Sequence, residues 1–220
     1  MKIPYRHIAK YLPSEHSIEE LSNHLFQLGH EHELENEIFN FELTPNRGDC
    51  FSLNGILREL NCFYKLNINK DLYKENIRSF ELDFVNNSIE NCPNISFLKI
   101  EIENTPEEYK GDLADYFDDL YLKKNNFFTD ISNYISYETG QPTHCYDLKT
   151  LGNKITLDVL DKEINFETLL NKTIKLAGSN LIFSDNNGMI NLAGIVGGSK
   201  TESKNDTKQV LIECAYFNPE

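Results

Sequence analysis

The chain has 220 residues, with 21 Lys or Arg against 35 Asp or Glu, so its formal net charge is −14 at pH 7. That charge argues against a free-standing nucleic-acid-binding protein, which normally presents a basic surface, while the 40% apolar content is ordinary for a globular protein. No apolar run is long enough to cross a bilayer and the N-terminus has no signal-like stretch, so we expect a cytoplasmic protein without a membrane partner.

Residues 1–68 are expected to form a small N-terminal module that begins with a helix and a strand. Ser17 and Glu20 have the spacing of a capping box, and the apolar residues that follow recur on one helical face until Gly29, a typical C-terminal cap. Apolar and polar residues then alternate over 39–43, which predicts a half-buried strand.

A turn and a second amphipathic helix complete this module. Pro45 disfavours a helical conformation for the residue before it, and Asp49 is suited to cap the helix that follows. The inward face of that helix is expected to consist of apolar residues at helical spacing, namely Leu53, Ile56, Leu57, Leu60 and Tyr64.

Residues 69–92 are polar and predict a linker, after which 93–220 form a larger second module. Its expected elements are a strand over 95–102, a helix in the acidic stretch 101–119, a helix over 127–137, and β-structure beyond Leu148 that includes a hairpin around 185–188 and a strand over 210–212. Helices followed by strands indicate an α+β fold whose C-terminal half is antiparallel and β-rich. The acidic stretch, with eight acidic residues and one lysine, predicts a solvated helix face from which a phosphate backbone is excluded.

Standard metal and cofactor signatures are missing from the sequence. It has no phosphate-binding Gly-rich loop, no dinucleotide fingerprint and no Cys-x-x-Cys pair, so we expect neither a metal nor a cofactor in this chain. His30 and His32 are an isolated pair in a polar segment and predict a surface feature. Cys145 follows His144 directly, and adjacent residues on a strand point to opposite faces, so they make a poor nucleophile–base pair.

Four clusters place glycine, proline or a single ionisable residue at the ends of predicted strands: 41–50, 130–147, 192–198 and 211–219. Taken alone, each cluster is weak evidence for a functional site, because glycine-rich turns and charged residues on edge strands are common in proteins. Glu213 stands out since it lies between Val210-Leu211-Ile212 and Cys214-Ala215, and a carboxylate in an apolar strand must be hydrogen-bonded, solvated through a pocket or shifted in pKa.

In this order the four clusters resemble the bacterial phenylalanyl-tRNA synthetase beta-subunit family. The segment Glu-Leu-Thr-Pro-Asn-Arg-Gly-Asp-Cys is similar to its small N-terminal module, and Gly-Gln-Pro-Thr-His, Ala-Gly-Ile-Val-Gly-Gly and Glu-Cys-Ala-Tyr-Phe-Asn-Pro are similar to its editing module. The resemblance implies a role in charging tRNA(Phe) with phenylalanine, in a heterotetramer of two alpha and two beta subunits, and hydrolysis of mischarged tyrosyl-tRNA. ATP and magnesium would serve the full synthetase, and this chain alone is not expected to aminoacylate tRNA.

The resemblance also implies site residues. Glu213 matches the position that reads the tyrosine hydroxyl, and His144, with an ordinary pKa near 6.5, matches a group that positions or deprotonates water. The expected substrate-binding residues are Asn133, Pro142, Gly194, Gly197 and Gly198. A separate editing pocket that recognises the tyrosine hydroxyl is useful, because a hydrophobic site for phenylalanine discriminates against an amino acid with an added hydroxyl by only about a hundredfold.

The sequence departs from the family pattern in two ways. Only eleven residues separate Gly29 from Phe41, too few for the family's tRNA-binding insertion, and the motif that completes the editing pocket after Glu213 is not in this chain. We therefore expect the N-terminal third of a beta subunit with an incomplete editing pocket. Two alternatives stay open: a non-catalytic protein that binds an aromatic amino acid, and a scaffold for an alpha subunit.

Overall fold

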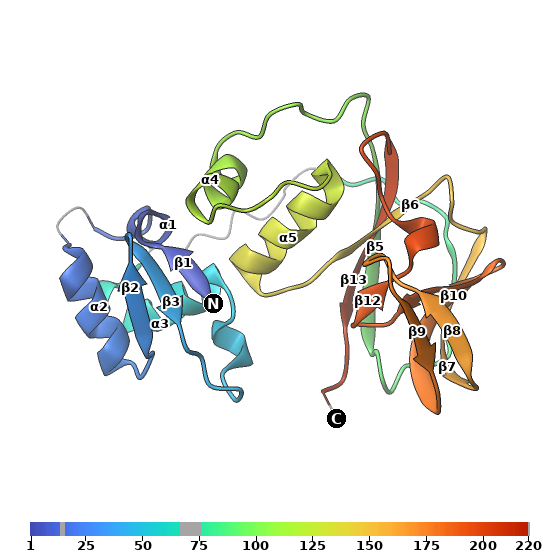
Figure 1. Ribbon diagram of the computed structural model, residues 1–220, viewed down its shortest axis with the longest axis horizontal. Helices are drawn as coiled ribbons and strands as arrows, with labels where there is room; N and C mark the ends of the chain where they lie inside the picture. Colours follow the sequence, from blue (N-terminus) through green and yellow to red (C-terminus); the bar gives the residue numbers. More distant parts are fainter. Residues whose placement is uncertain (14–15, 67–75, 220) are drawn as a thin grey trace. The chain divides into compact units, whose positions relative to one another are not determined.

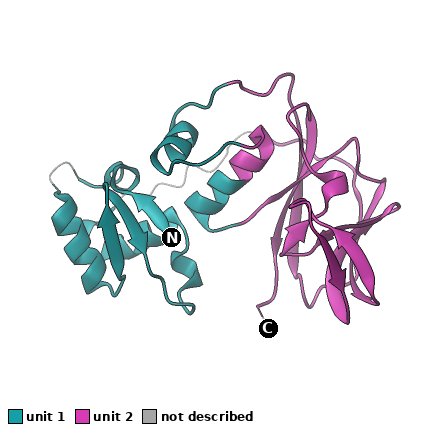
Figure 2. Ribbon diagram, in the orientation of Figure 1, with its two compact units in different colours: residues 1–76, 108–124, 133–141 teal, residues 77–107, 125–132, 142–220 magenta. Residues whose placement is uncertain are grey.

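The computed structural model describes residues 1–13, 16–66 and 76–219, which divide into two compact units (Figure 2). Unit 1 comprises residues 1–76, 108–124 and 133–141, and unit 2 comprises 77–107, 125–132 and 142–220. Of the acidic stretch 101–119 that we placed in the second module, residues 108–119 belong to unit 1 and residues 101–107 to unit 2. Helices and mixed or antiparallel sheets coexist, so the expected α+β class is confirmed.

Unit 1 is built around a small antiparallel sheet with the strand order β1-β3-β2. Its elements are β1 (Lys2–Pro4), α1 (Tyr5–Ala9), α2 (Ile18–Gln27), β2 (His32–Glu35), β3 (Ile38–Phe41), the 3-10 helix η1 (Gly48–Cys50), α3 (Leu53–Tyr64) and α4 (Asp112–Asp119) (Figure 1). Apolar side chains of the sheet and of α2 and α3 form one core, and the five predicted inward residues of α3 are all buried in it.

The helix ends of unit 1 confirm one predicted cap and correct another. The Ser17 hydroxyl accepts a hydrogen bond from the Glu20 N–H at 3.1 Å, as the capping box predicts. The cap of α3 is Ser52, whose hydroxyl accepts from the Gly55 N–H at 2.9 Å, and not Asp49. Asp49 lies three residues further from the helix, within η1, where the guanidinium groups of Arg47 and Arg58 hold its carboxylate.

Unit 2 contains a five-stranded sheet (β12-β11-β10-β7-β4), a three-stranded sheet (β5-β13-β6) and a two-stranded ribbon (β8-β9). The strands are β4 (Asp83–Asn86), β5 (Asn94–Glu101), β6 (His144–Asp147), β7 (Lys154–Asp161), β8 (Ile164–Glu167), β9 (Thr173–Leu176), β10 (Ser179–Asp185), β11 (Gly188–Leu192), β12 (Val196–Gly197) and β13 (Gln209–Tyr216), with η2 (Ser199–Thr201) between the last two. The predicted hairpin is β10–β11, which turns at Asp185 and Gly188.

Two expectations about the middle of the chain need correction. Residues 83–86 of the polar segment that we took for a linker form β4, which pairs in parallel with β7. Residues 67–75 of that segment lie outside the described residues. The long helix α5 (Phe127–Thr139) begins where expected but crosses the boundary between the units, since 127–132 belong to unit 2 and 133–139 to unit 1. Within the described ranges, no helix combines the length and the apolar character that a membrane span requires.

Candidate functional site

The central strand β13 of the three-stranded sheet carries Glu213, which lies between Phe97 of β5 and His144 of β6 in the strand register. Tyr146 of β6 is paired with Leu211 of β13. Because side chains alternate along a strand, Glu213, His144 and Tyr146 share one face of this sheet. The two predicted catalytic residues are therefore direct cross-strand neighbours.

The Glu213 carboxyl group is buried and hydrogen-bonded to an aromatic hydroxyl. It is 5% exposed, and the Tyr146 hydroxyl donates a hydrogen bond to Oε2 at 2.6 Å. Asn191 Nδ2 donates in turn to the Tyr146 hydroxyl at 2.9 Å. Burial raises the pKa of Glu213 to about 7, and the Tyr146 hydrogen bond, which favours the ionised carboxylate, acts in the opposite direction.

His144 is held in its neutral form by its surroundings. Burial lowers its pKa to about 4, and its ring meets the Tyr146 ring edge-on with centroids 4.5 Å apart. Its Nε2 atom is buried and has no hydrogen-bond partner among the described residues. A neutral imidazole with an unpartnered nitrogen can accept a proton from water, provided that water reaches it.

Two of the predicted glycines allow close packing around this site. A Cβ atom on Gly197 would lie 2.2 Å from His144 Cε1, so only glycine leaves room for the imidazole there. A Cβ on Gly198 would lie 2.8 Å from the Ile190 carbonyl oxygen, and the Gly198 N–H already donates to that oxygen at 2.8 Å. The N–H of Gly198 is therefore engaged within the sheet and does not point freely at a substrate.

The remaining predicted substrate residues lie in other places. Gly194 has φ +71° and lies against the Phe217 ring, and Pro142 lies in the loop before β6. Asn133 is exposed and belongs to unit 1, where it lines an open hollow of about 390 Å³ together with residues that include Lys2, Phe51 and Tyr116. The structure thus brings His144, Glu213 and Gly197 together and assigns Asn133 to the other unit.

Sequence reasoning missed Tyr146 and Asn191. Tyr146 is two positions after His144 on a strand, so the alternation of side chains placed it on the same face as His144. Asn191 is a polar residue between Ile190 and Leu192, and it is only 4% exposed. A buried amide in an apolar strand requires a partner, and that signal was readable in the sequence.

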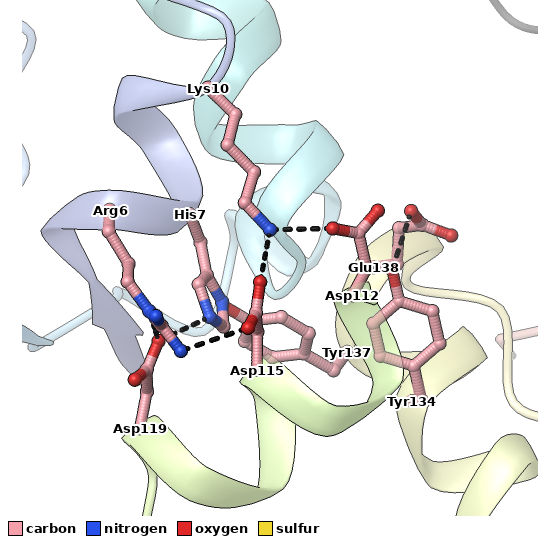
Figure 3. Close-up of polar contacts among 9 residues, drawn as sticks. All are labelled: Arg6, His7, Lys10, Asp112, Asp115, Asp119, Tyr134, Tyr137 and Glu138. Carbon is pink, nitrogen blue, oxygen red and sulfur yellow. Dashed lines mark hydrogen bonds and ion pairs between the residues drawn. The ribbon is translucent and has the colours of Figure 1, made fainter. Parts of the chain in front are cut away.

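A second polar cluster, in unit 1, consists of the residues drawn in Figure 3. Lys10, directly after α1, pairs with Asp112 and Asp115 of α4 at 2.5 and 2.7 Å, and Arg6 of α1 pairs with Asp115 and Asp119. The acidic face of α4 is therefore not merely solvated, as we expected, because Arg6 and Lys10 form ion pairs with three of its aspartates. These pairs are partly exposed and fasten α4 to the segment that contains α1.

The histidine pair near β2 is also not a surface feature. His30 is 3% and His32 9% exposed, and the ligand atoms of His30, Cys50 and Glu59 lie within 4.8 Å of one another. Arg47 already supplies a positive charge there, since its Nη2 lies 2.9 Å from both Cys50 Sγ and Glu59 Oε2. A divalent cation would have to displace this guanidinium group, so the cluster is better explained as a partly buried ion-pair network.

Comparisons with known proteins agree with the resemblance read from the sequence. A family model described as "B3/4 domain" matches residues 104–220. Proteins named Phenylalanine–tRNA ligase beta subunit are 33% identical in Psychrobacter arcticus and 31% in Fusobacterium nucleatum, over 84% and 85% of this chain. The chain spans 24% of the length of each.

A solved structure gives a likeness of fold. It is an N-terminal fragment of the phenylalanyl-tRNA synthetase beta-subunit from Pyrococcus horikoshii, with a TM-score of 0.50 and 16% sequence identity. The match covers 100% of this chain and 68% of that fragment.

Proposed function

This chain belongs to the B3/4 domain family, and on that premise we propose that it is the N-terminal part of a phenylalanine–tRNA ligase beta subunit whose unit 2 hydrolyses mischarged tyrosyl-tRNA. Charging of tRNA(Phe) with phenylalanine would be the activity of the whole ligase, with ATP and magnesium bound by the alpha partner. The part proposed for this chain is the removal of tyrosine after it has been attached in error. Such a protein would work in the cytoplasm.

The observation that carries this proposal is the hydroxyl bound to Glu213. A buried carboxyl group with no basic partner among the described residues accepts an aromatic hydroxyl at 2.6 Å. That is the contact needed to distinguish tyrosine from phenylalanine, which differ by one phenolic hydroxyl. A carboxylate has two oxygens with room for several donors, and Tyr146 occupies only Oε2.

His144 is suited to the hydrolytic step. In the proposed reaction a water oxygen attacks the ester carbonyl carbon, the bond from that carbon to the ribose oxygen breaks, and His144 takes the water proton and returns it to the ribose oxygen. The depressed pKa of His144 leaves the ring neutral at physiological pH, so a nitrogen lone pair is free to take the water proton, and the same burial makes it a weaker base than an exposed histidine. Gly197 supports this role because it leaves space for the ring.

The test is deacylation of preformed tyrosyl-tRNA(Phe) by the full beta subunit assembled with its alpha partner. Glu213→Ala should slow this reaction about ten- to a hundred-and-fifty-fold, since a hydrogen bond to a charged group contributes roughly 1.5–3 kcal/mol, and should leave phenylalanine charging nearly intact. His144→Ala should slow hydrolysis without the same preference for the hydroxyl. Glu167→Ala, which removes an exposed carboxylate of the same unit, is the matched control. If Glu213→Ala deacylated tyrosyl-tRNA(Phe) at the wild-type rate, the assignment of Glu213 to the tyrosine hydroxyl would be wrong.

A further inference from the structure

A fixed chain of hydrogen bonds leads to the Glu213 carboxyl group from the neighbouring sheet. Asn191 on β11 donates to the Tyr146 hydroxyl, and Tyr146 on β6 donates to Glu213 Oε2. The direction of this chain is set by simple counting. A phenolic hydroxyl has one proton and an ionised carboxylate can only accept, so with Asn191 donating to the phenolic oxygen that proton is directed at the ionised Glu213.

We propose that Tyr146, oriented by Asn191, is a positioning residue that holds Glu213 through Oε2 and keeps Oε1 available for the hydroxyl of a tyrosyl ester. This inference rests on the proposed function, since it assigns Glu213 to a substrate hydroxyl. Tyr146 itself does not touch the substrate. Its contribution is to fix which oxygen of Glu213 is engaged and which protonation state the carboxyl group adopts.

Packing makes Tyr146 a rigid support. Its side chain is fully buried within the main core of unit 2, among apolar residues that include Ile155, Leu157 and Phe183. An aromatic ring enclosed in this way cannot swing to another position without disturbing the core, so its hydroxyl stays where the backbone of β6 places it. The carboxyl group of Glu213 is consequently held by a part of the molecule that does not move when a substrate arrives.

Among the described residues, no charged group competes with the Tyr146 hydrogen bond for the Glu213 carboxyl group. The titratable groups near it are His144 on β6, which is neutral, Tyr146, and the thiols of Cys92 and of Cys214, the next residue along β13. Burial and the nearby Glu213 carboxylate raise the pKa of both thiols, so they too are uncharged at neutral pH. Within the described chain no Lys or Arg forms an ion pair with Glu213, and the Tyr146 hydrogen bond is what favours its ionised form.

The test removes the hydroxyl and keeps the ring. Tyr146→Phe should raise the pKa of Glu213 by about one pH unit or more, measured by NMR titration of the protein carrying ¹³C-labelled Glu side-chain carboxyl groups. Deacylation of tyrosyl-tRNA(Phe) by the assembled ligase should then fall about fivefold at pH 7 and approach the wild-type rate above pH about 8.5, after correction for spontaneous hydrolysis. Asn191→Leu should change both quantities in the same direction by a smaller amount.

Tyr134→Phe is the matched control, because it deletes a tyrosine–glutamate hydrogen bond of 3.0 Å in unit 1 and should leave both measurements unchanged. An unaltered Glu213 titration in Tyr146→Phe overturns the inference, whatever the deacylation rates are. A wild-type ligase in which Glu213 titrates as expected but tyrosyl-tRNA is not hydrolysed overturns the proposed function, and with it the role of Tyr146 toward a substrate.

Discussion

Each unit contains a hydrogen bond from a tyrosine hydroxyl to a glutamate carboxyl group, and the two bonds differ in their surroundings. In unit 1 the Tyr134 hydroxyl donates to Glu138 one helical turn away on α5, where both side chains are only partly buried. In unit 2 the Tyr146 hydroxyl donates to Glu213, which is 5% exposed. Water can solvate the first carboxylate, whereas the second depends on the protein for its partners. The Tyr146–Glu213 contact therefore matters more to the state of its carboxyl group.

The ionic groups of the units differ in the same way. In unit 1, Asp112, Asp115 and Asp119 of α4 pair with Arg6 or Lys10 (Figure 3), and all of these side chains are partly exposed. Unit 2 buries Glu213 with no cation beside it among the described residues. Exposed ion pairs contribute little to stability, while a buried lone carboxyl group lowers it. Such a costly feature is typical of a binding or catalytic site.

The largest expected effect is the pH dependence of stability that Glu213 causes. Its pKa is about 7 in the folded protein against 4.5 for an ordinary Glu, so its contribution to stability is fully present below pH 4.5 and is lost as the pH rises to 7. The loss amounts to about 3 kcal/mol. The free energy of unfolding of Glu213→Gln, relative to wild type, should therefore increase by about this amount between pH 4.5 and 7.5.

Urea unfolding at several pH values measures this difference directly. Glu138→Gln is the matched control from unit 1, and its difference from wild type should vary by less than about 1 kcal/mol over the same range. If the two variants showed equal pH dependence, the contrast between the buried and the partly exposed pair would be wrong.

The second expected effect concerns packing around His144. In Gly197→Ala the added methyl group meets the imidazole, and overpacking of this kind costs about 1–3 kcal/mol. The displaced ring should also slow deacylation of tyrosyl-tRNA. Gly48→Ala in unit 1 is the control, since a methyl group added there would have nothing within 4 Å and the φ of Gly48 is not in the left-handed region. Thermal unfolding of both variants is the measurement, and equal stabilities would refute the close contact.

Much of the fold and part of the site were predictable from local patterns. The N-cap of α2, the inward face of α3 and the β10–β11 hairpin follow from the spacing of residues within about a dozen positions. Glu213 was recognisable because a carboxylate interrupts an apolar strand. Tyr146 was not recognised, since a tyrosine in a strand is an ordinary core residue until its hydroxyl has a partner.

The contacts that escaped prediction join residues far apart in the sequence. The acidic face of α4 was taken as solvated because its basic partners, Arg6 and Lys10, lie more than 100 residues earlier in the chain. Strand β4 was missed because its four residues are polar or only half-buried, and it exists through parallel pairing with β7. Local periodicity carries no information about either partner, so only the three-dimensional arrangement reveals them.

The smallest expected effect comes from the exposed ion pairs of unit 1. Lys10→Met removes the contacts with Asp112 and Asp115 but keeps a similar apolar stem, and it should lower the free energy of unfolding by only about 0.2–1 kcal/mol. The loss should shrink in 1 M NaCl, where the screening length falls to about 3 Å. Lys123→Met replaces an exposed lysine of the same unit for which the described residues provide no ion pair, and it should have no salt-dependent effect. Urea unfolding at low and high salt decides the matter. If Lys10→Met lowered the free energy of unfolding by more than about 2 kcal/mol at both salt concentrations, this ion-pair cluster would be shielded from water as Glu213 is.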